Sequence, residues 1–136
     1  MTTSRLSALL FLMSLCFALP GRSAEAADLT GVWATAADVC NKVFVKKGNR
    51  VSFAKNSDIY GSGFIIEGKE IRGAMAKCRI KRTTEDGATI HMIAACATDI
   101  MLSDVQLSVR IIDANSIARL FPGMSDMSVS YYRCTM

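Results

Sequence analysis

Apolar and polar residues alternate with a period of two along most of the chain after its first thirty residues. The clearest run places four aliphatic side chains on one face, with polar or charged residues between them: Val105, Leu107, Val109 and Ile111. Successive side chains of a strand point to opposite faces, so this pattern predicts strands with one buried face.

Short turns separate the alternating runs, at residues 48–49, 68–69, 84–87 and 113–115. Glycine- and asparagine-containing turns of this length are typical of β-hairpins. Only residues 35–41 resemble a helix, with Thr35 as its cap. With the segment around residues 31–34, the chain holds about eight or nine strands.

Consecutive hairpins form a meander, and closing a meander into a barrel removes its exposed edges. We therefore predict an all-β fold, a small up-and-down antiparallel β-barrel with one short helix. A barrel of this size has an interior just wide enough for its own side chains or one small ligand. We expect a mostly filled interior, with Phe44, Phe53, Phe64 and Phe121 among the available side chains. A two-sheet β-sandwich is the alternative.

The first 26 residues have a different pattern from the rest. A basic start at residues 1–5 precedes an apolar run at residues 6–19, and small residues follow at Ala24 and Ala26. This layout is typical of a cleaved secretory signal peptide, and the run is shorter than the ~20 residues of a spanning helix. We expect a signal peptide at residues 1–26 and a single exported domain at residues 27–136. The protein is then periplasmic or secreted, with no transmembrane span in the mature chain.

Charge adds little to this picture. The chain has 16 Lys+Arg and 12 Asp+Glu, a formal net charge of +4. Such a weak excess does not strongly favour either nucleic acid or an anionic membrane as a partner.

The cysteines predict a disulfide framework. One of the five, Cys16, lies in the signal peptide, and the other four are Cys40, Cys78, Cys96 and Cys134. An even number in a small exported domain indicates disulfides. Folding residues 74–97 about Gly87 places Cys78 opposite Cys96, which predicts Cys78–Cys96 together with Cys40–Cys134. The rival pairing, Cys40–Cys78 with Cys96–Cys134, stays open.

Catalytic and metal-binding patterns are weak. The sequence has one histidine and no CxxC pair, which argues against a metal site and leaves no cofactor indicated. His91 has the parity of an outward-facing residue, with no partner placed beside it for catalysis. We therefore expect no enzymatic activity.

Two kinds of residue are candidates for binding. Lys77, Arg79 and Lys81 form an outward basic stripe, which is either a solubilising face or a docking patch for an acidic partner or an anionic surface. Tyr60, Phe121 and Met124 lie in the two longest predicted loops, residues 58–63 and 121–126, which combine apolar side chains with glycine.

The strand opening Gly31-Val32-Trp33 resembles the GxW motif of lipocalins and related calycin barrels. In those barrels the tryptophan closes one end under an arginine from the last strand, and the resemblance implies Trp33 and Arg133 for these structural roles. The whole chain resembles small periplasmic bacterial β-barrel proteins that share a GVW start, four cysteines and a terminal YYRC. More loosely, it is similar to the bacterial periplasmic protease-inhibitor and lysozyme-inhibitor barrels.

These observations predict an exported, non-enzymatic periplasmic binding protein. Its partner is unidentified, and a periplasmic or extracellular protein recognised through barrel-mouth loops, as by an inhibitor, is the leading hypothesis. The alternatives are a carrier of a small hydrophobic ligand and a structural envelope module without a defined ligand.

Overall fold

The computed structural model describes residues 28–136, so the predicted signal peptide and Cys16 lie outside the described residues. The strands are β1 (Gly31–Ala34), β2 (Phe44–Lys47), β3 (Arg50–Phe53), β4 (Gly63–Glu67), β5 (Glu70–Arg72), β6 (Lys77–Asp86), β7 (Thr89–Ala97), β8 (Leu102–Asp113), β9 (Ser116–Phe121) and β10 (Met124–Cys134). The helical segments are the 3₁₀ turns η1 (Ala37–Val39) and η2 (Ser57–Ile59) and the short helix α1 (Cys40–Val43).

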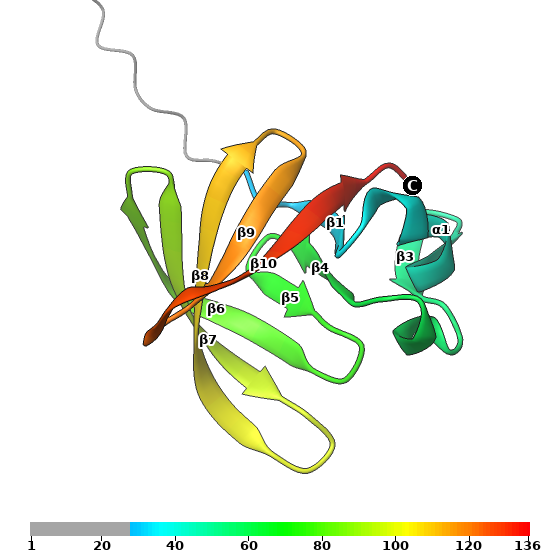
Figure 1. The fold of residues 1–136 in the computed structure, drawn as a ribbon. Helices are drawn as coiled ribbons and strands as arrows, with labels where there is room; N and C mark the ends of the chain where they lie inside the picture. Colours follow the sequence, from blue (N-terminus) through cyan, green and yellow to red (C-terminus); the bar gives the residue numbers. More distant parts are fainter. Residues whose placement is uncertain (1–27) are drawn as a thin grey trace, which may run out of the picture.

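Eight of these strands form a closed antiparallel barrel in the order β1-β10-β9-β8-β7-β6-β5-β4 (Figure 1). From β4 to β10 each strand pairs with the next one in the chain, and β1 closes the barrel between β10 and β4. The predicted barrel is confirmed, and the β-sandwich alternative is wrong.

Side chains of the predicted inward parity form one hydrophobic cluster inside the barrel. Leu107, Val109 and Ile111 all contact the interior cluster, and Phe64 packs on Tyr131 with ring centroids 4.8 Å apart. The buried members of this interior cluster are Trp33, Ile66, Ile71, Ile90, Met92, Val109, Ile117 and Tyr131.

A second hydrophobic layer lies outside the barrel. Val32 and Ala34 alternate with the inward Trp33 along β1, so the outer face of β1 is apolar too and needs cover. The α1 helix and the separate two-stranded β2–β3 sheet supply that cover. The expectation that Phe44 and Phe53 fill the barrel interior is therefore wrong, because both belong to this outer layer.

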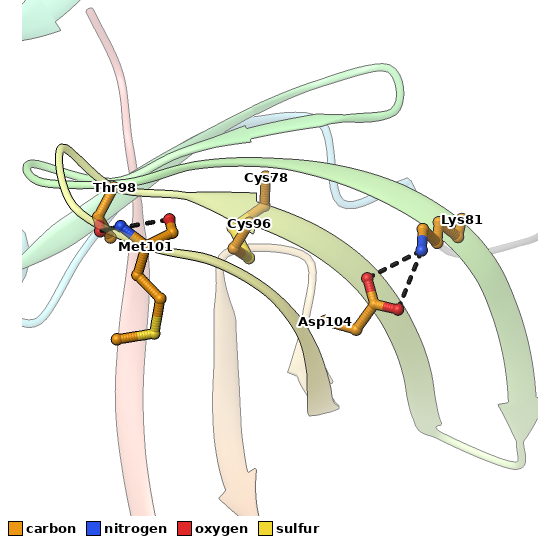
Figure 2. Close-up of a disulfide and its surroundings, with 6 residues drawn as sticks. All are labelled: Cys78, Lys81, Cys96, Thr98, Met101 and Asp104. Carbon is orange, nitrogen blue, oxygen red and sulfur yellow. Dashed lines mark hydrogen bonds and ion pairs between the residues drawn. A yellow bond between two sulfur atoms is a disulfide. The ribbon is translucent and has the colours of Figure 1, made fainter.

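Both predicted disulfides are present, and the rival pairing is excluded. Cys78 and Cys96 face each other across β6 and β7 with a Cα–Cα distance of 4.0 Å (Figure 2). Cys40 of α1 is bonded to Cys134, the last residue of β10, across a sequence separation of 94. This second bond fastens the outer layer to the barrel wall.

The predicted helix is displaced along the chain. Helical structure runs from Ala37 to Val43 instead of residues 35–41, and the residue before it, Ala36, makes no side-chain cap. Thr35 is not a cap, because its hydroxyl and backbone N–H bond the backbone of Ser62 and extend the pairing of β1 with β4.

The β6–β7 turn is also shorter than predicted. Strand β6 continues to Asp86, which pairs with Thr89, so residues 84–86 belong to the strand. The register shifts between Ile80 and Arg82, which makes Lys81 an extra residue in a β-bulge. The bulge absorbs the one-residue difference and keeps Cys78 opposite Cys96.

Candidate functional site

One end of the barrel is closed by the residues that precede β1. The Arg133 guanidinium lies 4.3 Å from the Trp33 ring, as expected for a cation stacked on an indole. It also donates hydrogen bonds to the backbone oxygens of Asp28 (3.1 Å), Thr30 and Ala114 (3.0 Å). Arg133 therefore holds residues 28–30 across the barrel end, and the structural roles expected for Trp33 and Arg133 match this geometry.

Leu29 occupies the middle of that closed end. Its carbonyl accepts a 2.9 Å hydrogen bond from Trp33 Nε1, and its side chain packs against the interior cluster. Two clefts of about 220 and 260 Å³ remain, both lined in part by Leu29. Each is smaller than the ~300 Å³ at which ligand pockets usually begin, so neither is of carrier size as it stands.

The opposite end carries a larger groove, of about 520 Å³, on the outer face of β7 and β8. The turn between β9 and β10 is only Pro122-Gly123, because Phe121 ends one strand and Met124 begins the next. The predicted loop at residues 121–126 is thus mostly strand. Residues 125–127 form a bulge in β10, since Met124 pairs with Phe121 but Ser128 pairs with Leu120.

The groove combines an apolar wall with polar groups. The apolar side chains come from the end of β9, the turn and the bulged start of β10, and the polar ones, apart from Ser125 of β10, come from the outer face of β7 and β8. The lining consists of Leu120, Phe121, Pro122, Met124 and Met127 with His91, Gln106, Ser108, Arg110, Gly123 and Ser125.

His91 has a structural hydrogen bond in this groove. It points outward, as predicted, and its Nδ1 lies 2.8 Å from Ser108 Oγ. The Ser108 residue is only 3 % exposed, so its hydroxyl is poorly placed to attack a substrate. Among residues 28–136, no cluster of three His, Cys, Asp or Glu side chains could hold a metal ion.

An open strand edge adjoins the groove. Strand β8 pairs with β7 from Leu102 to Arg110, but its pairing with β9 begins only at Ser108. Within the described part of the chain, no strand pairs with the other edge of residues 102–107. Gln106, which lines the groove, belongs to this edge.

The direction of the backbone groups at this edge follows from the disulfide. The short Cα–Cα distance between Cys78 and Cys96 marks an opposed pair that exchanges no backbone hydrogen bonds. The backbone groups of Cys96 therefore point toward β8, where Cys96 pairs with Ser103. Alternation along β8 then turns the backbone N–H and C=O groups of Asp104 and Gln106 toward the open edge.

The structure does not gather the predicted binding residues into one site. Phe121 and Met124 lie together in the groove. Tyr60 follows η2, half-exposed, with the Lys42 ammonium 5.6 Å from its ring. Tyr60 thus lies beside the outer layer and contributes nothing to the groove.

The basic stripe is divided. Lys77 and Arg79 are exposed on β6, while Lys81 at the bulge binds both carboxylate oxygens of Asp104, at 2.8 and 3.0 Å (Figure 2). Two of the three predicted cations therefore remain exposed without an ion pair to another described residue.

Sequence reasoning missed the remaining groove residues. Gln106 and Arg110 have outward parity in a predicted strand, but parity alone does not say which outward positions border a groove. The three-residue bulge of β10 carries no turn signal, and it is the bulge that brings Met127 over β8.

Comparisons with family models, curated proteins and solved structures returned no match to this chain. Among residues 28–136, no helix has the length and apolar character needed to cross a membrane.

Proposed function

We propose that this chain is an exported, non-enzymatic binding protein that takes up an extended segment of a partner protein. The segment would lie antiparallel or parallel to the open edge of β8 and act as one more strand. The single observation that carries this proposal is the unpaired edge of residues 102–107 beside a groove with an apolar wall. Strand addition at an exposed edge is a recurrent mode of peptide recognition.

The two features have different parts in recognition. Backbone groups of Asp104 and Gln106 would provide hydrogen bonds that are independent of the partner's sequence. Alternate side chains of the added strand would face the groove and provide selectivity. Met124 and Met127 are both half-exposed there, and methionine adapts to ligands of different shape.

The rigid surroundings of the edge favour binding over catalysis. The Cys78–Cys96 disulfide and the Lys81–Asp104 ion pair already hold the neighbouring strands in place. Binding therefore costs little conformational entropy at this edge. The buried Ser108 hydroxyl supports a non-enzymatic role. Two disulfides and the predicted signal peptide support an oxidising, periplasmic or extracellular location. Inhibitor-like recognition of a periplasmic or extracellular protein fits this arrangement.

The test is selection of extended peptides from a displayed library on the purified protein, followed by affinity measurements on two variants. Gln106→Pro removes the N–H at the open edge, whereas Gln106→Ala keeps the N–H and removes only the side chain. We expect Gln106→Pro to weaken peptide binding by roughly tenfold, from the loss of one backbone hydrogen bond, and Gln106→Ala to weaken it less.

A second pair of variants separates the groove from the rest of the surface. Met124→Asp places a charge in the groove and should abolish selection of apolar peptides. Tyr60→Asp changes a side chain of similar exposure outside the groove and should leave binding unchanged. Equal peptide affinity for Gln106→Pro and the unmodified protein would refute strand addition.

A further inference from the structure

A second surface, distinct from the groove, lies at the tips of two neighbouring hairpins. The β5–β6 turn (residues 73–76) and the β7–β8 turn (residues 98–101) are adjacent, because Arg72 pairs with Lys77, Lys77 with Ala97 and Ala97 with Leu102. In Figure 1 the β7–β8 hairpin, drawn in yellow, extends away from the body of the barrel.

The tips carry apolar side chains that nothing in the described chain covers. Ile100 is 92 % exposed, Met75 85 %, Leu102 83 % and Met101 59 %. Three of the four are consecutive, and the fourth lies on the neighbouring turn. Contiguous apolar exposure of this degree marks an interaction surface.

Two cations of β6, Lys77 and Arg79, lie next to these tips on the barrel side. Lys77 is in register with Ala97 of β7 and, through it, with Leu102 of β8, on the outer face of the sheet. Arg79 lies on the same face, two residues further along β6 from the turn. Arg79 and Leu102 also wall a shallow hollow of about 590 Å³, which exists because the outer face of β7 carries only Ala95 and Ala97 there.

The nearby acids cancel this charge only in part. Asp104 at the hollow's rim is already bound to Lys81. Glu70, which pairs in register with Arg79, shares Arg72 with Glu67, and the ion pairs are 3.5 Å and 3.0 Å long respectively. Asp99 is the one acid in the β7–β8 turn itself, and neither Lys77 nor Arg79 forms an ion pair with another described residue.

We propose that the β5–β6 and β7–β8 hairpin tips dock the protein on an anionic lipid bilayer. Met75, Ile100, Met101 and Leu102 enter the boundary between headgroups and acyl chains, and Lys77 and Arg79 contact the acidic headgroups. Binding of this kind grows with the buried apolar area and with the attraction of cations to anionic lipid.

The shape and chemistry of the tips favour a bilayer over a protein partner. Protein interfaces are rich in methionine and arginine as well, but their centres are dominated by aromatic residues that fill pockets. The exposed large apolar side chains of the tips are all aliphatic or methionine, and they project at or beside turns. Projecting apolar side chains backed by cations complement a soft surface with acidic headgroups above hydrocarbon.

The experiment is co-sedimentation with phosphatidylcholine vesicles that do or do not contain phosphatidylglycerol, at low and high salt. We expect binding only to the phosphatidylglycerol vesicles and its loss at high salt, because screening weakens the contribution of the cations. Double substitution Ile100→Asp with Leu102→Asp should reduce partition by more than about tenfold, because each apolar side chain contributes to insertion. Ile112→Asp, at an exposed position at the opposite barrel end, is the matched control and should change little.

The contribution of the cations is tested with the double substitution Lys77→Gln and Arg79→Gln, which should reduce partition onto the anionic vesicles roughly thirtyfold. Lys47→Gln with Arg50→Gln, at the β2–β3 turn, is its control. Met75→Asp alone provides a variant on a separate hairpin, so a folding defect in one hairpin does not decide the outcome. The proposal is overturned if the protein does not co-sediment with anionic vesicles, or if the control and tip variants bind them equally. It is also overturned if the tip variants instead abolish self-association or capture of a soluble protein in the absence of vesicles.

Discussion

The two disulfides should contribute unequally to stability, and the structure predicts the order. Cys40–Cys134 closes a segment with a sequence separation of 94, and Cys78–Cys96 closes one of 18. In the chain-entropy account, closing these loops removes about 4.7 and about 3.2 kcal/mol of unfolded-state freedom. Removing the first disulfide by double substitution to alanine should therefore cost about 1.5 kcal/mol more than removing the second.

The first disulfide also has a structural role that adds to this difference. It joins α1 to the end of β10, and both cysteines are buried in the outer hydrophobic layer. The second joins two strands that already pair along their length. Its loss leaves the hairpin's own backbone bonds in place.

Urea unfolding of the two double-alanine variants, each compared with the unmodified protein, measures these costs. The dependence of the unfolding free energy on urea concentration must be compared as well, because a change in this slope signals a change in the unfolded or folded ensemble. An equal or larger cost for removing Cys78–Cys96 would refute the reasoning.

Three further outcomes are expected. Gly63→Ala should destabilise the protein by about 1–3 kcal/mol in thermal or urea unfolding, because the new Cβ would lie 2.3 Å from the Trp33 carbonyl oxygen, a backbone atom; an unchanged melting temperature would contradict this packing. Arg133→Lys keeps the charge but not the planar guanidinium that bonds three carbonyls. It should lower the free energy of unfolding by about 1–3 kcal/mol and speed proteolysis at residues 28–30; unchanged stability and proteolysis would argue against Arg133 holding these residues. Hydrogen bonds from the Ser116 side chain and then the Asn115 backbone lower the pKa of Asp113, so its stabilising effect is present above its unfolded-state pKa and is lost as the pH falls through its lower folded-state pKa. Asp113→Asn should therefore flatten the acid side of the stability profile, and an unaltered profile would count against this role.

The barrel was predictable because its determinants are local. Alternation at Val105 to Ile111 gives the buried face of β8, and tight turns force neighbouring strands to pair. The disulfide pairing followed from the same parity, since Cys78 and Cys96 share a face of one hairpin.

The outer layer was not predictable from alternation. The β2–β3 hairpin has the same pattern as a barrel strand pair, and its position is decided by tertiary contacts of Phe44 with the outer face of β1. A period-two pattern specifies that one face is buried, but it does not specify which surface covers that face.

The groove was predictable only in part, because bulges have no clear sequence signal. Phe121 and Met124 were identified from loop composition, yet the three extra residues of β10 determine where these side chains lie. The open edge arises because β8 is longer than β9, a mismatch that depends on strand ends, and these are poorly defined by pattern.

The central claim, an open β8 edge that accepts a strand, is tested most directly by residue-resolved amide hydrogen exchange along β8. The account predicts alternation in the unbound protein: slow exchange at Ser103, Val105 and Leu107, which bond β7, and fast exchange at Asp104 and Gln106. A selected peptide should then slow exchange at Asp104 and Gln106. Uniform protection of the five amides in the unbound protein, or no change on adding peptide, would contradict the account.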